Sequence, residues 1–121
     1  MDLRKIAVIE NTTIEYMSPE LLFLGHSGQP YRGTLYIHFV SKGESVNLVD
    51  LKKYITSLRS CIFTAENIAH EIFNKIHTVI DVDTLGVIVD LSARGGIQQR
   101  IHFGTNFEPV KKQNIFQVSQ H

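Results

Sequence analysis

The 121-residue chain contains no tryptophan, one cysteine and three prolines, and its twelve basic side chains are balanced by twelve acidic ones. A single cysteine excludes an intramolecular disulfide framework and a cysteine-rich zinc site. Because the charge is balanced, tRNA binding gains no support from bulk electrostatics. No apolar run approaches the length of a membrane-spanning helix, and the N-terminus lacks a signal-peptide pattern. We therefore expect one cytoplasmic domain over residues 1–121 that has no membrane partner.

Apolar residues at helical spacing predict two helices in the middle of the chain. The first begins at Asn47 or Asp50, either of which can cap it, and runs through Leu58. After a break at residues 61–63, the second covers residues 65–80 with Thr64 as its N-cap. Its apolar stripe consists of Ala65, Ile68, Ala69, Ile72, Phe73, Ile76, Val79 and Ile80.

Alternating apolar and polar residues predict strands on both sides of these helices. The first residues form one strand, or two short strands joined at Asn11–Thr12. Thr34 to Ser41 forms a strand, with Leu35, Ile37 and Phe39 facing one way. Residues 84–93 and 97–103 form a β-hairpin that turns at residues 94–96.

The segments between these elements contain turn-forming residues. Residues 21–33 include GHSGQPYRG, with three glycines and a proline, which predicts a loop. Residues 42–45 predict a polar turn. From about residue 104 we expect a flexible tail or a segment that packs on a neighbour.

The resulting order of strands and helices predicts an α+β fold, with an antiparallel sheet and two helices on one face. The sheet would have two open edges, and closing subunits into a barrel is one way to pair them.

Several residues could carry chemistry, and residue type alone leaves their roles open. Glu66 suits the helix dipole in the first turn or could hold a ligand. Cys61 is either a small hydrophobic residue or a nucleophile ahead of a helix. Arg94, Gly95 and Gly96 form a hairpin turn that could also present donors to a phosphate. No two histidines have metal-ligand spacing, so we expect no metal site.

The order of four segments along the chain indicates a family resemblance that no single residue reveals. SGQPYRGTLYIHFV, LKKYITSLRS, Glu66 near a helix start and ARGGI together resemble the QueF-type nitrile reductases. Those enzymes reduce 7-cyano-7-deazaguanine to its aminomethyl form with NADPH, on the way to queuosine in tRNA. They belong to the tunnelling-fold (T-fold) superfamily, whose ββααββ subunits assemble into barrels that bind purine- or pterin-like ligands at subunit interfaces. The resemblance therefore implies a T-fold subunit in a homo-oligomer.

The resemblance also implies roles for particular residues. Glu66 falls on the glutamate that grips the guanidine-like edge of the heterocycle, and a carboxylate can accept two parallel N–H bonds from such an edge. Arg94, Gly95 and Gly96 match the segment on the side of the NADPH cofactor. The family's helical motif falls on Leu51, Lys53, Tyr54, Ser57 and Arg59.

Three positions depart from the family pattern. The slot of the nucleophilic cysteine holds Leu24 or one of its immediate neighbours, none of which is cysteine. Tyr31 replaces the aspartate that handles the proton, and Ala65 replaces a histidine. Nitrile reduction needs a thiolate to form a thioimide before a hydride can add, and leucine cannot supply one.

These departures favour a protein that binds a purine-, deazapurine- or pterin-like heterocycle through Glu66 without the thioimide reaction. Two alternatives remain. In the first, the chain is an active enzyme of the queuosine or archaeosine pathway, a nitrile reductase or an amidinotransferase, in which Cys61 acts as nucleophile or His26 as acid and base. In the second, the chain is a non-catalytic subunit that completes a barrel with an active paralogue.

Overall fold

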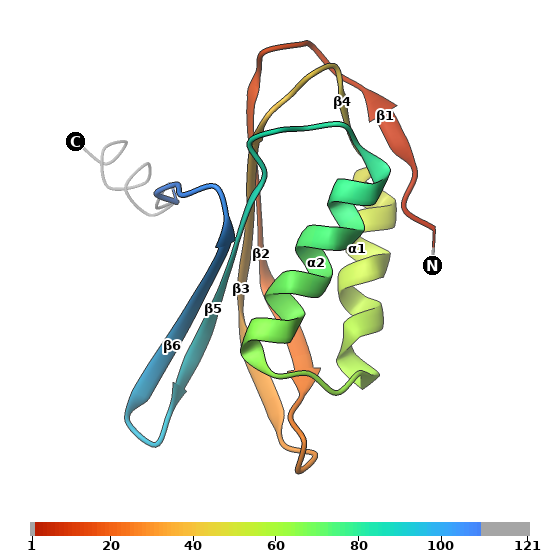
Figure 1. The fold of residues 1–121 in the computed structure, drawn as a ribbon. Helices are drawn as coiled ribbons and strands as arrows, with labels where there is room; N and C mark the ends of the chain where they lie inside the picture. Colours follow the sequence, from red (N-terminus) through yellow and green to blue (C-terminus); the bar gives the residue numbers. More distant parts are fainter. Residues whose placement is uncertain (1, 110–121) are drawn as a thin grey trace, which may run out of the picture.

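The computed structural model describes residues 2–109 (Figure 1). Within this range, two helices and six strands follow the predicted order, with one short strand beyond those predicted, after the first hairpin. The elements are β1 (Lys5–Ala7), β2 (Thr13–Leu24), β3 (Pro30–Val40), β4 (Glu44–Val46), α1 (Leu48–Ser57), the 3-10 turn η1 (Leu58–Ser60), α2 (Ala65–Val79), β5 (Gly86–Arg94) and β6 (Ile97–Gly104).

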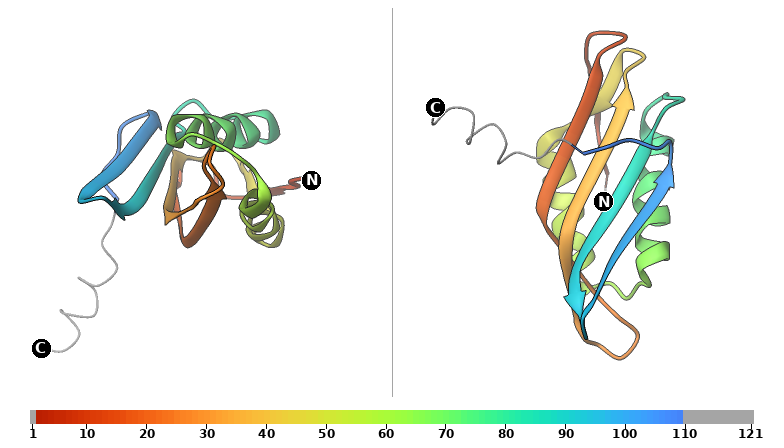
Figure 2. Two further views of the ribbon diagram at one scale, coloured as in Figure 1. Left: turned by 90° about the horizontal axis from the view of Figure 1, so that it is seen from below. Right: turned by 90° about the vertical axis from the view of Figure 1, so that its left-hand side faces the viewer.

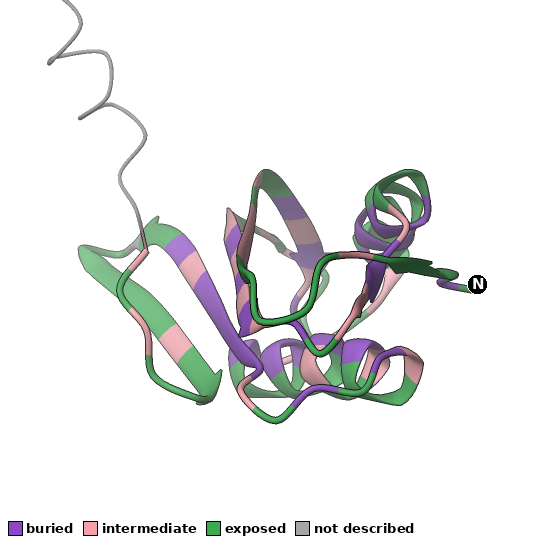
Figure 3. Cartoon of the chain, turned by 90° about the horizontal axis from the view of Figure 1, so that it is seen from above, coloured by how far each residue is buried: buried purple, intermediate pink, exposed green. Residues whose placement is uncertain are grey.

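The main sheet is antiparallel with the strand order β2-β3-β5-β6, and both helices cover the same face of it (Figure 2). The core lies between the sheet and the helices (Figure 3). Alternation along β3 turns Leu35, Ile37 and Phe39 toward the core. The α2 stripe brings Ile68, Ile72 and Ile76 to full burial. The predicted α+β class is therefore confirmed, and the arrangement is consistent with a T-fold subunit.

Both helices begin at side chains that cap them. The Asn47 side-chain oxygen accepts a hydrogen bond from the Asp50 N–H at 3.0 Å. The Thr64 hydroxyl accepts one from the Asn67 N–H at 3.2 Å. Each bond satisfies a backbone donor that the helix itself leaves unpaired. The predicted starts of both helices are thus confirmed.

The predicted loop over residues 21–33 is wrong. β2 and β3 extend into this range as a hairpin and leave only residues 25–29 as the turn. Leu21 and Phe23 are each 1% exposed, because alternation along β2 turns them into the core. Gly25 and Gly28 lie in the turn and Pro30 begins β3, whereas Gly33 lies inside β3 and pairs with strands on both sides.

A small second sheet pairs β1 with β4, so part of the predicted polar turn at residues 42–45 is a strand. Of the two alternatives for the N-terminal residues, one strand or two, the structure has two, the short β1 and the long β2, and β1 pairs with β4. Arg4, just before β1, binds the Asp50 carboxylate through its guanidinium at 2.7 Å and through its backbone N–H at 3.0 Å. These hydrogen bonds lower the pKa of Asp50 from 3.8 to about 2. The pair ties the N-terminal segment to the first turn of α1.

After β6, the described chain crosses the face of the sheet opposite the helices. The Phe107 ring stacks on His38 of β3, with 4.7 Å between ring centroids. The rest of the predicted tail, residues 110–121, lies outside the described residues. No helix in the described part of the chain is long and apolar enough to cross a membrane.

Candidate functional site

One end of the main sheet brings together most of the residues singled out in the sequence (Figure 1). There the Leu24 N–H at the end of β2 donates to the Cys61 carbonyl oxygen at 2.9 Å. The Phe63 N–H donates back to the Leu24 carbonyl oxygen, also at 2.9 Å. These bonds fix residues 61–63 beside the β2–β3 turn. The start of α2 therefore lies next to the slot that Leu24 occupies.

Glu66 lies in the first turn of α2 with an exposed side chain. Within residues 2–109 its carboxylate makes no ion pair and no side-chain hydrogen bond. A carboxylate at this position complements the partial positive charge at the start of the helix. The carboxylate is thus open to a ligand that offers N–H donors.

Aromatic side chains line the β2–β3 turn. Phe23 stacks on Tyr31 with ring centroids 5.4 Å apart and meets Phe63 edge-on at 6.4 Å. The Tyr31 hydroxyl accepts a hydrogen bond from Gln29 Nε2 at 3.2 Å. A Cβ on Gly25 would lie 2.5 Å from the Tyr31 ring, so glycine leaves room for that ring. Sequence reasoning missed this cluster because residues 21–33 were expected to be a loop, although Leu21 and Phe23 carry a period of two.

Cys61 and His26 occupy different environments at this end of the sheet. Cys61 is half-buried, and its thiol donates to the Ser57 carbonyl oxygen at 3.6 Å. His26 is exposed in the β2–β3 turn. No described histidine forms a hydrogen bond with Cys61, so the structure holds no preformed Cys–His pair there.

The predicted Arg94-Gly95-Gly96 turn closes the β5–β6 hairpin at the same end of the sheet (Figure 2). Gly95 and Gly96 have φ angles of 59° and 82°, which residues with a Cβ rarely adopt. No atom lies within 4 Å of a Cβ built on either glycine. The turn therefore presents bare backbone to open space, which suits the approach of an anionic group.

The helical motif divides into buried and exposed positions. Leu51 and Tyr54 are each 5% exposed and belong to the core. The Tyr54 hydroxyl donates to Glu71 of α2 at 3.5 Å, and burial, with a contribution from Glu71, raises the pKa of Tyr54 above its usual value. Tyr54 thus joins the two helices. The Ser57 hydroxyl donates to the Tyr54 carbonyl oxygen, and Lys53 and Arg59 are exposed.

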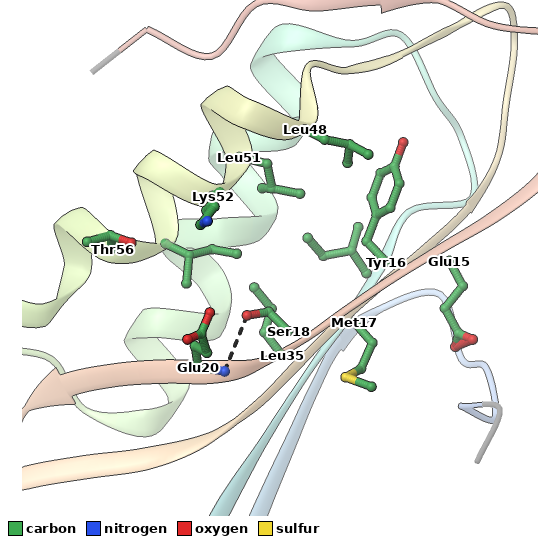
Figure 4. Close-up of a pocket in the computed structure, with 12 residues that line it drawn as sticks. Glu15, Tyr16, Met17, Ser18, Glu20, Leu35, Leu48, Leu51, Lys52 and Thr56 are labelled. Carbon is green, nitrogen blue, oxygen red and sulfur yellow. Dashed lines mark hydrogen bonds between the residues drawn. The ribbon is translucent and has the colours of Figure 1, made fainter. Parts of the chain in front are cut away.

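An apolar groove of about 310 Å³ lies between α1 and β2 (Figure 4). Tyr16 points from β2 toward the helix, whereas Met17 points away from it. The Tyr16 hydroxyl is hydrogen-bonded to the Ser45 hydroxyl at 2.6 Å. Leu51 of the helical motif lines this groove, whereas Glu66, Cys61, His26 and the Arg94-Gly95-Gly96 turn do not, and the groove surface is mostly apolar. The groove combines apolar surface with three charged residues in its lining, Glu15, Glu20 and Lys52.

Over residues 2–109, no group of three or more histidine, cysteine, aspartate or glutamate side chains is placed to hold a metal ion.

Comparison with known proteins adds to this geometry. Residues 30–109 match the sequence profile of the family described as QueF-like protein, and the match includes Glu66 and the Arg94-Gly95-Gly96 turn but begins after Leu24. The NADPH-dependent 7-cyano-7-deazaguanine reductase of Chlorobium chlorochromatii (strain CaD3) is 30% identical over 90 residues, which cover 74% of this chain and 78% of the relative. The protein of the same name from Pelodictyon phaeoclathratiforme is 31% identical over 90 residues with the same coverage. That from Rickettsia felis is 37% identical over 71 residues, which cover 59% of this chain and 25% of the longer relative. The chain therefore belongs to the QueF-like protein family.

Proposed function

We propose that this chain binds a planar purine-, deazapurine- or pterin-like heterocycle through Glu66 and does not form a thioimide with a nitrile. The observation that carries the proposal is the contrast between two neighbouring positions. Glu66 remains at the start of α2 with its carboxylate exposed and unpaired among the described residues. Leu24, beside it, stands where the family resemblance requires a thiolate.

The surroundings of Glu66 suit a flat ring. The exposed carboxylate can accept two parallel N–H bonds from an amino-pyrimidinone edge. The aromatic cluster of Phe23, Tyr31 and Phe63 lies at the same end of the sheet. The reductases among its relatives are named for 7-cyano-7-deazaguanine, which is a heterocycle of this kind.

The proximity of Cys61 to Leu24 favours a second candidate function. The Cys61 carbonyl oxygen accepts a hydrogen bond from the Leu24 N–H, so the Cys61 backbone lies beside the slot in which the resemblance places a cysteine. In this candidate, Cys61 attacks the nitrile carbon, and His26 is available as acid or base in the adjoining turn. NADPH supplies a hydride when bound, and Arg94, Gly95 and Gly96 would hold its anionic groups against the open turn.

We propose that the chain works as a homo-oligomer whose subunits pair along the edges of the main sheet. β2 and β6 form the two edges, and β6 is exposed along most of its length. Exposed edge strands are usually paired or covered. A mass measurement by light scattering tests this, and a monomer at micromolar concentration would contradict it. A barrel that forms only with a cysteine-bearing paralogue would instead identify a structural partner subunit.

The decisive experiment is a calorimetric titration with 7-cyano-7-deazaguanine, guanine and neopterin while NADPH absorbance is followed. Wild type should bind at least one of these rings without oxidising NADPH. Glu66→Gln should weaken binding by about 10-fold to 100-fold, because charge-assisted hydrogen bonds contribute roughly 1.5–3 kcal/mol each.

Two further variants separate ligand binding from helix stability. Glu71→Gln removes the same charge further along α2 and should bind as wild type does. Glu66→Asp keeps a charge at the helix start but retracts the carboxylate by one methylene, so stability should hold while affinity falls. Equal binding by Glu66→Gln and wild type would refute the role of Glu66. NADPH oxidation that Cys61→Ser abolishes would establish the second candidate instead.

A further inference from the structure

A second cavity, of about 400 Å³, opens at the β2 edge of the sheet and shares only Glu20 with the lining of the groove under α1. Arg32 and Thr34 of β3, Ser92 of β5 and Arg59 of η1 supply its polar groups. Four polar side chains from three separate elements thus converge on one space. They come from parts of the chain that are far apart in sequence, so the fold rather than a local run of charge creates the site.

The two arginines have no counter-ion within the described residues. Neither guanidinium makes an ion pair or a side-chain hydrogen bond among residues 2–109. The other arginines with described side chains are paired: Arg4 binds Asp50 at 2.7 Å, and Arg100 binds Asp90 at 3.1 Å. Arg32 and Arg59 therefore differ from them in leaving all their donors available in one cavity.

An irregularity in β2 lies at this cavity. Its pairing with β3 shifts between Ser18 and Leu21, so Pro19 and Glu20 form a bulge opposite Thr34. Bulges interrupt the ladder and redirect side chains, and Pro19 has no N–H to restore the pairing. Both bulged residues line the cavity.

The nearby acidic side chains do not neutralise the positive charge of the two arginines in the cavity. Glu20 is the only acidic side chain among the described lining residues, and Figure 4 shows it pointing toward α1. Asp90, opposite Thr34 on the next strand, already accepts hydrogen bonds from Gln98 at 2.8 Å and from Arg100 at 3.1 Å. Two arginines against one glutamate leave one net positive charge in the lining.

We propose that this cavity binds the phosphate group of a small phosphorylated ligand. Each guanidinium can donate two parallel N–H bonds, and the Thr34 and Ser92 hydroxyls can donate one each. Such a set matches the three terminal oxygens of a phosphate, whereas a single arginine already satisfies both oxygens of a carboxylate. The site does not involve Glu66, so it does not depend on heterocycle binding there.

The test is a titration of the full chain, at constant ionic strength, with pyrophosphate, inorganic phosphate and succinate in turn. Backbone amide NMR shifts of residues 32–34, 59 and 92 report the site directly. Wild type should bind pyrophosphate at least about 10-fold more tightly than succinate. Arg32→Gln and Arg59→Gln should each weaken binding about 10-fold, which corresponds to one charge-assisted pair of about 1.4 kcal/mol.

The matched control is Lys52→Gln, which removes the same charge from an exposed position on α1 outside this cavity. It should leave pyrophosphate binding unchanged, as should Glu66→Gln, which separates this site from the heterocycle site. Equal loss in Lys52→Gln would show that only net charge matters and would overturn the proposal. Succinate binding as tightly as pyrophosphate would assign the cavity to carboxylates, and unchanged shifts with every anion would also overturn it.

Discussion

The N-cap of α2 connects the stability of the helix to the proposed ligand site. Thr64→Ala removes the hydroxyl that accepts the Asn67 N–H at 3.2 Å. Because Asn67 is exposed, water takes over that donor, and the expected loss is about 1 kcal/mol rather than the upper end of the range for N-caps. For a domain of this size, such a loss lowers the melting temperature by about 4 °C.

The same substitution should weaken ligand binding, because Glu66 lies in the turn that the cap holds. The rest of α2 stays anchored by buried residues such as Ile68 and Ile72, so the destabilisation falls mainly on the first turn. A loss of 1 kcal/mol corresponds to about a 5-fold shift in the population of that turn. We therefore expect up to about 5-fold weaker binding of the heterocycle.

Thermal unfolding followed by circular dichroism and a calorimetric titration measure the two effects. Thr64→Ser keeps the capping hydroxyl and should match wild type in both assays. Equal stability of Thr64→Ala and Thr64→Ser would show that the cap contributes nothing. A Thr64→Ala protein with the expected loss of stability but unchanged affinity would refute the idea that the first turn positions Glu66.

Two further variants test the packing and electrostatics of the fold. The pKa of Asp50 is lowered in the folded state, so the ion pair with Arg4 stabilises the fold above pH 3.8, and that stabilisation is lost as the pH falls through about 2. Asp50→Asn should be less stable than wild type at neutral pH, and urea titrations should show the difference shrinking with acidification; a constant difference would refute the linkage. Gly33→Ala should cost about 1–3 kcal/mol, because its Cβ would clash with the Asp90 carbonyl and lie 2.9 Å from the Leu91 Cα on the next strand. Chemical denaturation measures this cost, and a neutral effect would mean that β3 and β5 can separate at that point.

The helical half of the fold could be predicted because its signals are local. Thr64 caps α2, and Ile68, Ile72 and Ile76 repeat at the spacing of one helix face. The β5–β6 hairpin was also predictable, since two adjacent glycines supply the positive φ angles of its turn. In each case a short stretch of sequence contains the whole physical cause.

The first hairpin was only partly predictable because its glycines and proline mark a turn without showing how short that turn is. The burial of Leu21 and Phe23 decides where β2 ends, and that burial comes from helices later in the chain. The pairing of β1 with β4 likewise depends on Arg4 reaching Asp50. The cavity of Arg32 and Arg59 shows the same limit, because only the folded chain brings β3 and η1 together.

Two of the departures, at Leu24 and Tyr31, change this end of the sheet in the same physical direction. Where the family resemblance calls for a thiolate and a carboxylate, Leu24 is half-buried and Tyr31 stacks on Phe23 at 5.4 Å. A thiolate and a carboxylate would have to stay reactive and solvated. Leu24 and Tyr31 instead stabilise the fold by packing. Active sites commonly sacrifice stability for reactivity, and a site released from its reaction can recover that stability. An exposed Glu66 carboxylate at the same end of the sheet as a half-buried Leu24 is the arrangement expected under the proposed function, in which a ligand binds without the covalent step.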